Sequence, residues 1–412
     1  MELKDYLNAS YTAYQAVQGA KSLLLSSGFV PLKETESWHL ERGGKYFVER
    51  NGSSLIAFCV GTPDYFKIVA SHTDSPCLKL KENPAMERDS FVRWNVEPYG
   101  GGIWYSFFDR PLKVAGRVAV KEGNGIRMEN VVSPYTLTIP SLAVHMNRGV
   151  NDGFSVNPQV DLLPLAALGA CDLFSGLTSE EVLSYDLYVV PAEAAYESGV
   201  HGEFLTAPRL DNLTSVFSSL LALTEAEGDG ICVAALFDNE EVGSRTLQGA
   251  GSDFLRRTLN KIGRCLGISV EVYAKSYFVS LDNAHSVHPN HPEKCDPTNR
   301  PVLGGGVVIK NHANKAYTTD ALSSAIAKLI FERAGVKYQL FFNRSDARSG
   351  GTLGAISQGQ ISVPTVDLGI AQLAMHSAVE TMASSDFEHL LKGLKAIYSA
   401  SIRIDGDKIV VE

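Results

Sequence analysis

Histidine and acidic side chains follow several apolar runs in this chain of 412 residues. Three runs of strand length end in such residues: Phe66–Ala70 before His72 and Asp74, Ile231–Phe237 before Glu240 and Glu241, and Tyr277–Leu281 before Asp282. Asp211 and His376 lie in two further polar segments. Imidazole and carboxylate ligands without thiolates suit a hydrolytic pair of Zn, Co or Mn ions better than a structural zinc site. The residue types therefore indicate a metal centre that activates water.

Each position also has a plain structural interpretation. Asp211 precedes a helical pattern, where an aspartate is a good N-cap. Asp282 could simply begin a turn, and Glu240 and Glu241 could form a solvated acidic loop. However, adjacent carboxylates repel each other, and two bound cations would offset that repulsion. One glutamate could then bind metal while the other serves as general base.

The apolar runs predict buried strands that alternate with amphipathic helices. The predicted strands are 54–60, 66–70, 231–237, 277–281 and 364–368, and the predicted helices are 3–26, 212–227, 320–334 and 386–401. This order favours an α/β sheet covered on both faces. In such sheets ligands bind beyond the carboxyl ends of the strands, where the candidate residues gather.

The chain is long for a single core, and its texture changes between Ala85 and Gly202. Short strand-like runs, such as Gly116–Val120 and Tyr135–Ile139, alternate there with glycine-containing turns. We expect a catalytic α/β unit formed by residues 1–84 and 203–412, interrupted by a β-rich unit of residues 85–202.

Composition excludes several classes of partner. The formal net charge is −9 and there is no tract rich in lysine or arginine, so nucleic acid and anionic membrane surfaces are poor candidates. The apolar runs are too short to span a bilayer, and the N-terminus lacks a secretion signal pattern. The six cysteines form no CxxC pair, which favours a reducing, cytoplasmic location.

Five motifs that run through nearly the whole chain resemble the M18 metallopeptidases, whose eukaryotic representative is aspartyl aminopeptidase. They are Ser71–Pro76, Arg209–Asn212, Phe237–Ser244, Asp282–Asn290 and Gln372–Ser377, in family order. The resemblance implies a zinc-aminopeptidase-like fold, with a mixed β-sheet sandwiched by helices and an inserted β-rich domain. It also implies a metal-dependent aminopeptidase that removes N-terminal residues from peptides.

The resemblance assigns ligands for two divalent ions, most simply zinc. One ion would be held by His72, Asp211 and Asp282. The other would be held by Asp211, Glu241 and His376, so that Asp211 bridges the two.

The resemblance also implies the catalytic roles. Glu240 is similar to the family's general base, and Asp74 to the acid that orients His72. His145 matches a histidine of the inserted domain that reaches the active site of a neighbouring subunit, near the scissile carbonyl. From sequence alone His145 could equally be a third histidine ligand; we favour stabilisation of the oxyanion.

Substrate preference follows from the same resemblance. Lys310 matches a position in the pocket for the N-terminal side chain, and Tyr317, Arg344 and Asp346 fall in other segments that line it. Lys310 favours Asp or Glu at the N-terminus. The loop 344–352 lacks the Pro-Cys of the eukaryotic aspartyl enzymes and resembles the bacterial branch, which weakens that preference. The family forms tetrahedral dodecamers through the inserted domain, so we expect a homo-oligomer.

Two alternatives stay open at this point. A dinuclear-zinc deacylase or carboxypeptidase of related fold would need a cationic clamp for a substrate carboxylate, rather than an acidic end for an α-amine. A non-catalytic assembly protein that kept the fold would bind no metal and cleave no peptide.

Overall fold

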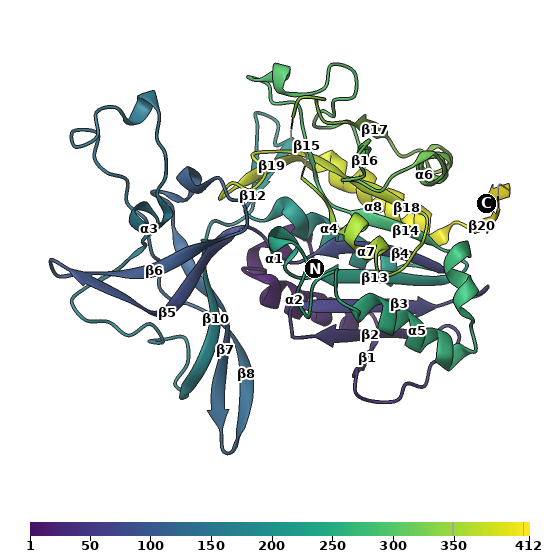
Figure 1. Ribbon diagram of the computed structural model, residues 1–412, viewed down its shortest axis with the longest axis horizontal. Helices are drawn as coiled ribbons and strands as arrows, with labels where there is room; N and C mark the ends of the chain where they lie inside the picture. The colour runs from purple at the N-terminus through teal and green to yellow at the C-terminus, as the bar shows by residue number, and fades with distance from the viewer. Residues whose placement is uncertain (348–349, 407) are drawn as a thin grey trace.

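The computed structural model describes residues 1–347, 350–406 and 408–412. Figure 1 shows a large sheet with its helices on the right and a separate smaller sheet on the left. Within the described residues the large sheet has 13 strands and the smaller one has six. The predicted α/β class, a mixed sheet with helices and a second β-rich sheet, is confirmed.

The helices are α1 (Leu3–Ala9), α2 (Ala13–Ser26), α3 (Pro158–Asp161), α4 (Leu210–Thr224), α5 (Phe254–Leu266), α6 (Ala321–Ala334), α7 (Leu353–Gln358) and α8 (Ser384–Ser399). The large sheet contains β1 (Val30–Leu32), β2 (Lys45–Arg50), β3 (Ser54–Val60), β4 (Phe66–His72), β11 (Tyr196–Ser198), β12 (Phe204–Ala207), β13 (Ile231–Phe237), β14 (Tyr277–Leu281), β15 (Ala284–His285), β16 (Val307–Lys310), β17 (Tyr338–Phe341), β18 (Thr365–Leu373) and β19 (Glu380–Ala383). The strands β20 (Ile402–Asp405) and β21 (Lys408–Val411) form a short hairpin.

Four neighbouring strands, β13, β4, β14 and β18, run parallel at the centre of the large sheet. Their residues are almost all buried, which explains why they appear in the sequence as continuous apolar runs. The register pairs Phe237 with His72, so the carboxyl ends of β13 and β4 meet at one edge. The polar residues that follow these strands therefore emerge side by side.

Helices cover both faces of this sheet. Successive side chains of a strand point to opposite faces, and β14 shows both contacts. The hydroxyl of Tyr277 donates to the Ser323 carbonyl of α6, at 2.7 Å. Ser280 points the other way, and a Cβ on Gly354 of α7 would lie 2.7 Å from it. Since α8 packs against both α4 and α6, these three helices share the Tyr277 face.

The smaller antiparallel sheet has the order β8-β7-β10-β5-β6-β9. Its strands are β5 (Cys77–Arg88), β6 (Phe91–Tyr99), β7 (Leu112–Glu122), β8 (Gly125–Val132), β9 (Leu165–Leu168) and β10 (Val182–Pro191). It has its own apolar core, built around residues such as Trp94, Val118 and Leu187. The division into units at residues 85 and 202 stays a prediction.

Two local predictions are wrong. The single helix expected over residues 3–26 is two helices, because the Ser10 amide closes α1 on the carbonyls of Tyr6 and Leu7 and Thr12 is extended. The run Tyr135–Ile139 forms only isolated bridges, through Leu137 and Thr138.

Within the described residues, every helix is too short or too polar to cross a bilayer.

Candidate metal centre

The structure brings the five predicted metal ligands together at the carboxyl edge of the central strands. His72 Nε2 lies 3.5 Å from Asp211 Oδ1 and 3.5 Å from Asp282 Oδ1. His376 Nε2 lies 3.5 Å from Asp211 Oδ2 and 3.3 Å from Glu241 Oε1. The two carboxylate oxygens of Asp211 thus face two different groups of ligands, which is the arrangement of a bridging carboxylate.

Each ligand is positioned by the end of an element. His72 is the last residue of β4, Glu241 lies in the short turn after β13, and Asp282 follows β14. His376 lies in the loop between β18 and β19, with φ +68°. Asp211 lies at the start of α4 but has non-helical angles, so it is not a simple N-cap.

The start of α4 is fixed against the end of β14 by two asparagines. Asn212 Nδ2 donates to the Leu281 carbonyl at 2.8 Å. In the other direction Asn283 Nδ2 donates to the Leu210 carbonyl at 3.0 Å. This pair of hydrogen bonds determines how far Asp211 lies from the strand end that carries Asp282.

Both histidines present Nε2 to the site because Nδ1 is held elsewhere. His72 Nδ1 lies 3.0 Å from the carbonyl of Asp74, and His376 Nδ1 lies 3.0 Å from the carbonyl of Gly101. A carbonyl on one ring nitrogen fixes the tautomer that leaves the other free to bind metal. Both rings therefore present Nε2 in the form that can bind a metal ion.

The donor set fits a pair of divalent cations. Asp211 Oδ1 and Glu241 Oε1 are buried and have no hydrogen-bond partner among the described residues. Such orphaned oxygens are costly unless an ion satisfies them. The spacings between the ligand atoms, 3.3–3.5 Å, also match the roughly 3.4 Å that separates two ligand atoms of a tetrahedral ion with bonds of about 2.1 Å.

The charges of the site are strongly coupled. Burial lowers the pKa of His72, but the carboxylates of Asp211, Asp282 and Asp74 outweigh it and raise this pKa well above its usual value. At His376, burial again lowers the pKa, but Asp211 and Glu241 outweigh burial and raise this pKa to about 12. Burial raises the pKa of Asp211, but the two imidazoles more than offset this and lower it.

Glu240 lies beside these groups. One of its carboxylate oxygens lies within 4.8 Å of a ligand atom of His72 and of one of Glu241. Burial raises its pKa most, His72 lowers it, and Asp282, Glu241 and then Asp74 raise it further, to about 8. A carboxylate with this pKa can both accept and return a proton near neutral pH.

Asp74 contacts both His72 and the turn that carries Glu240 and Glu241. Its Oδ1 accepts the Glu240 amide and its Oδ2 accepts the Glu241 amide, each at 3.1 Å. Its Oδ1 is 3.4 Å from His72 Nδ1, farther than the Asp74 carbonyl. The two predicted regions, one after β4 and one after β13, are thereby joined.

Glu380 was missed by the sequence analysis. This buried carboxylate accepts the Asp211 amide at 2.9 Å and the His376 amide at 2.7 Å, so it holds the backbone of two predicted ligands. Burial, and then the charge of Asp211, raise its pKa to about 8. The sequence offered a weak signal, a glutamate four residues after His376.

Two of the predicted substrate residues adjoin the centre. Lys310 is buried, with Nζ 3.4 Å from Asp282 Oδ2 and 3.2 Å from the Asn283 carbonyl. Burial lowers its pKa, but Asp282, then Tyr317 and other acidic neighbours raise the net value above normal. Its ammonium group lies 5.1 Å from the ring centre of Tyr317. Lys310 is therefore a charged group at the edge of the centre.

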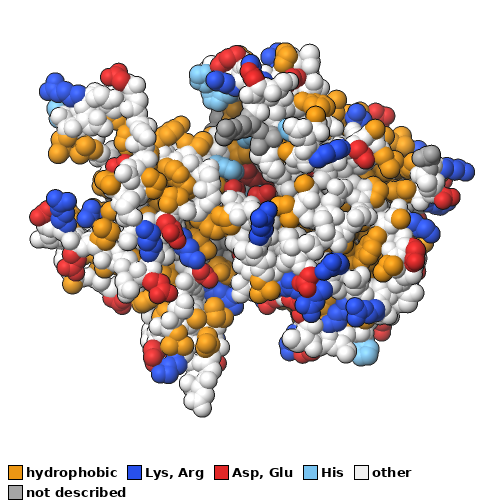
Figure 2. Space-filling model, in the orientation of Figure 1, with side chains coloured by type: hydrophobic (Ala, Val, Ile, Leu, Met, Phe, Trp, Pro, Cys, Tyr) orange, Lys and Arg blue, Asp and Glu red, His pale blue; other side chains and the backbone are white. Residues whose placement is uncertain are grey.

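The other predicted residues lie apart from these ligands. Arg344 and Asp346 form an exposed ion pair at 2.8 Å, in an outer cleft that Cys295 and Arg300 also line. Residues 348 and 349 of the same loop lie outside the described residues. His145 lies in an exposed loop and makes no ion pair with the centre among the described residues. Figure 2 shows acidic and histidine side chains in a hollow between the two sheets.

Comparison with known proteins agrees with this centre. Residues 6–398 match the family described as Aminopeptidase I zinc metalloprotease (M18). A probable M18 family aminopeptidase 2 of Clostridium novyi (strain NT) is 40% identical, over 97% of this chain and 98% of that protein. The structure is similar to one solved for an Ape4 and Nbr1 complex, with TM-score 0.91, 35% identity, and 96% and 84% of the two chains covered.

A further solved structure, the S. cerevesiae mApe1 dodecamer, has TM-score 0.83 and 27% identity, and the match covers 96% of this chain and 97% of that one. The family match extends over nearly the whole chain and includes every candidate ligand. The chain belongs to the M18 family of zinc metalloaminopeptidases.

Proposed function

We propose that this aminopeptidase uses two divalent cations, most simply zinc, held by His72, Asp211, Glu241, Asp282 and His376. The observation that carries the proposal is the position of Asp211, whose two oxygens face different groups of ligands. A single cation in either group would leave Asp211 Oδ1 or Glu241 Oε1 buried without a partner among the described residues, which is costly. Two cations satisfy both.

Glu240 is the general base of this proposal. Two bound cations would polarise the first peptide carbonyl and lower the pKa of a water from about 15.7 toward about 7. Glu240 accepts the proton of that water and passes it to the leaving amine. Asp74 keeps the Glu240 backbone in place through the amide hydrogen bond at 3.1 Å.

The acidic hollow suits a free N-terminal amine, because carboxylates favour the charged form of an amine. Lys310 supports a preference for Asp or Glu as the N-terminal residue. Its ammonium group has acidic neighbours that keep it charged, and it lies against the ring of Tyr317 at the edge of the centre. A buried ammonium group can pair with a substrate carboxylate at this edge. Arg344 and Asp346 would contact the substrate farther out, in the outer cleft that they line.

We further propose that residues 85–202 form the unit through which copies of this chain assemble, in a tetrahedral dodecamer. Three apolar side chains of one loop are 51–74% exposed: Leu142, Val144 and Met146. A loop of this kind is typical of a surface that another protein covers. A neighbouring copy would bring His145 to the oxyanion.

All six cysteines are free, which supports a cytoplasmic location.

The first experiment replaces Glu240 by Gln. The variant should keep both metal ions, because Glu240 is not one of the proposed ligands, and should lose about 10²–10⁴-fold in kcat. Glu227→Gln, an exposed glutamate outside the centre, is the matched control. Metal analysis and peptide hydrolysis are measured on all three proteins. Activity of Glu240→Gln equal to that of the control would refute the proposed base.

The second experiment compares free-amine peptides with their N-acetylated forms. An aminopeptidase should cleave the first set and leave the second intact. A deacylase or a carboxypeptidase would act on the acetylated set. Fluorogenic substrates with Asp, Glu, Leu or Ala at the N-terminus, assayed with Zn, Co and Mn, then define the preferred residue and metal.

A further inference from the structure

The end of β6 and the segment that follows it contact both halves of the metal centre. The Gly101 carbonyl lies 3.0 Å from Nδ1 of His376. The Ile103 amide donates to the His376 carbonyl at 2.8 Å, and the Ala378 amide donates to Ser106 Oγ at 2.8 Å. Residues 101–106 of this segment therefore hold the His376 loop.

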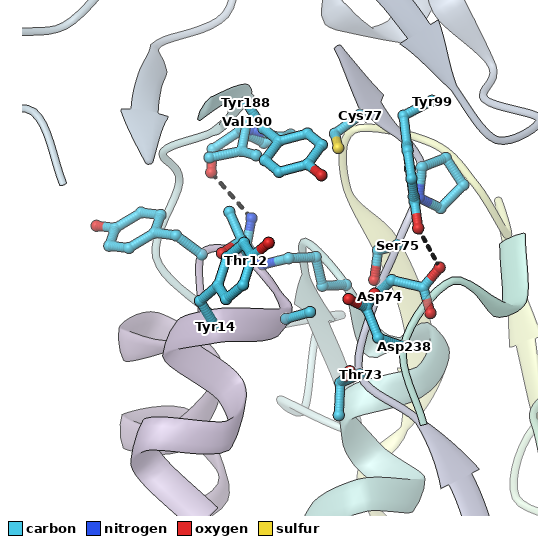
Figure 3. Close-up of a pocket in the computed structure, with 15 residues that line it drawn as sticks. Thr12, Tyr14, Thr73, Asp74, Ser75, Cys77, Tyr99, Tyr188, Val190 and Asp238 are labelled. Atoms are coloured by element: carbon cyan, nitrogen blue, oxygen red, sulfur yellow. Dashed lines mark hydrogen bonds between the residues drawn. The ribbon is translucent and has the colours of Figure 1, made fainter. Parts of the chain in front are cut away.

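Tyr99, the last residue of β6, contacts the other half. Its hydroxyl donates to Asp74 Oδ2 at 2.7 Å, as the dashed line in Figure 3 shows. The same Oδ2 accepts the Glu241 amide, and the other oxygen of Asp74 accepts the Glu240 amide. A single carboxylate, held by Tyr99, therefore supports both glutamates of the centre.

The direction of the hydrogen bonds is determined by the partners. Asn239 Nδ2 donates to the Tyr99 hydroxyl at 2.8 Å, and Oδ1 of the same side chain accepts from Thr246 and Gln248. The hydroxyl has one proton to give, and Asp74 receives it. Burial, and then the charges of Asp74 and Asp238, raise the pKa of Tyr99, which keeps that proton in place.

We infer that Tyr99 is a positioning residue for peptide hydrolysis: through Asp74 it fixes the turn that carries Glu240 and Glu241. The inference rests on the proposed function, because it assigns Glu240 as base and Glu241 as ligand. It also gives the smaller sheet a part in the centre, since Tyr99 ends one of its strands. Partners that orient metal ligands typically change metal affinity or activity by about 10–100-fold when removed.

The chain offers a matched control in the neighbouring ring. Tyr188 of β10 packs edge-on against Tyr99, with ring centres 5.6 Å apart. Both rings line a cavity of about 30 Å³ behind Asp74, shown in Figure 3. Among the described residues the Tyr188 hydroxyl makes no hydrogen bond to Asp74. Removing either hydroxyl makes the same chemical change in the same cavity, but only one change reaches the glutamate turn.

The test compares wild type, Tyr99→Phe and Tyr188→Phe as full-length, zinc-loaded protein. Three quantities are measured: kcat and KM on one aminoacyl substrate, zinc affinity by competition with a chelator, and the visible absorption of the cobalt-substituted protein. Tyr99→Phe should lower kcat by about tenfold or more and weaken zinc by a similar factor, with KM within about twofold. Its cobalt spectrum should shift, and Tyr188→Phe should match wild type in all three.

Two results would overturn the inference. One is a Tyr99→Phe protein that matches wild type in kcat, zinc affinity and cobalt spectrum. The other is an equal loss in both variants, which would assign the effect to the cavity rather than to Asp74. A wild-type protein that binds no metal pair would instead refute the proposed function. Thermal unfolding is measured on each variant, so that a loss of activity can be distinguished from a loss of folded protein.

Discussion

Two regions of this protein carry predicted catalytic residues, and they differ in how the residues are held. At the carboxyl edge of the large sheet, His72, Asp211 and His376 are fixed by strand ends, carbonyls and the buried Glu380. In the smaller unit, His145 lies in an exposed loop whose apolar side chains have no cover in the single chain.

In the proposed assembly, the single chain completes the first region and a second copy would complete the other. Buried strands determine ligand positions to within hydrogen-bond distances before any substrate binds. An exposed loop has no such constraint until a partner covers it. We therefore expect metal binding to be a property of the single chain, and full catalysis to be a property of the assembly.

The largest effect should come from Asp211→Asn, which tests whether the single chain builds the centre. Loss of the proposed bridging carboxylate should remove at least one cation and, since metal catalysis supplies several kcal/mol, lower kcat/KM by about 10⁴-fold. Asp320→Asn is the control, because Asp320 caps α6 by accepting the Ser323 amide at 2.8 Å. That variant should keep its metals and most of its stability, because asparagine caps a helix about as well as aspartate. Full metal content in Asp211→Asn would break the comparison.

The next effect tests the exposed loop. His145→Ala should keep both metals and lose about 10²–10³-fold in kcat, the usual cost of a lost oxyanion donor. Co-assembly of His145→Ala chains with Glu240→Gln chains should restore activity, because each lacks a different half of the site. No recovery in mixed assemblies would place His145 in its own chain's reaction. His201→Ala, another exposed histidine, is the control.

A smaller effect is expected at the edge of the centre. Lys310→Met removes a charge that can pair with an acidic N-terminal side chain, so the preference for Asp or Glu over Leu should fall about 10–100-fold. Lys315→Met, on the adjacent exposed loop, should leave the preference unchanged. Because Lys310 also contacts Asp282, zinc content is measured beside the kinetics. Unchanged selectivity with full zinc would exclude Lys310 as the selecting residue.

The smallest expected effect is the dependence of zinc affinity on pH. The raised pKa values of His72 and His376 mean that both imidazoles are protonated near neutral pH before metal binds. Metal binding needs neutral imidazole, so it displaces these protons, and zinc affinity should rise about tenfold per pH unit for each one. Titration calorimetry in buffers of different ionisation enthalpy counts the protons. An affinity independent of pH between 6 and 8 would contradict this.

The sequence located the strands of the centre well. The strands β3, β13 and β14 occupy the predicted residues, because their apolar runs are buried on both faces and end in polar residues. The first helix was misread, since apolar spacing alone does not show the turn at Ser10. Glu380 and Tyr99 were not found, because one glutamate and one tyrosine carry no pattern until the backbone amides and the carboxylate they contact are in place.

What the sequence by itself determined is the set of chemical groups: imidazoles and carboxylates placed after buried strands, and no thiolate pair. Residue type and strand periodicity are local properties, so they can be read from the chain. What only the tertiary structure decided is that Asp211 turns one oxygen to each histidine, that Tyr99 bonds to Asp74, and that Glu380 accepts the amides of two predicted ligands. Those contacts join residues far apart in the chain, and their distances exist only once the two sheets have folded against each other.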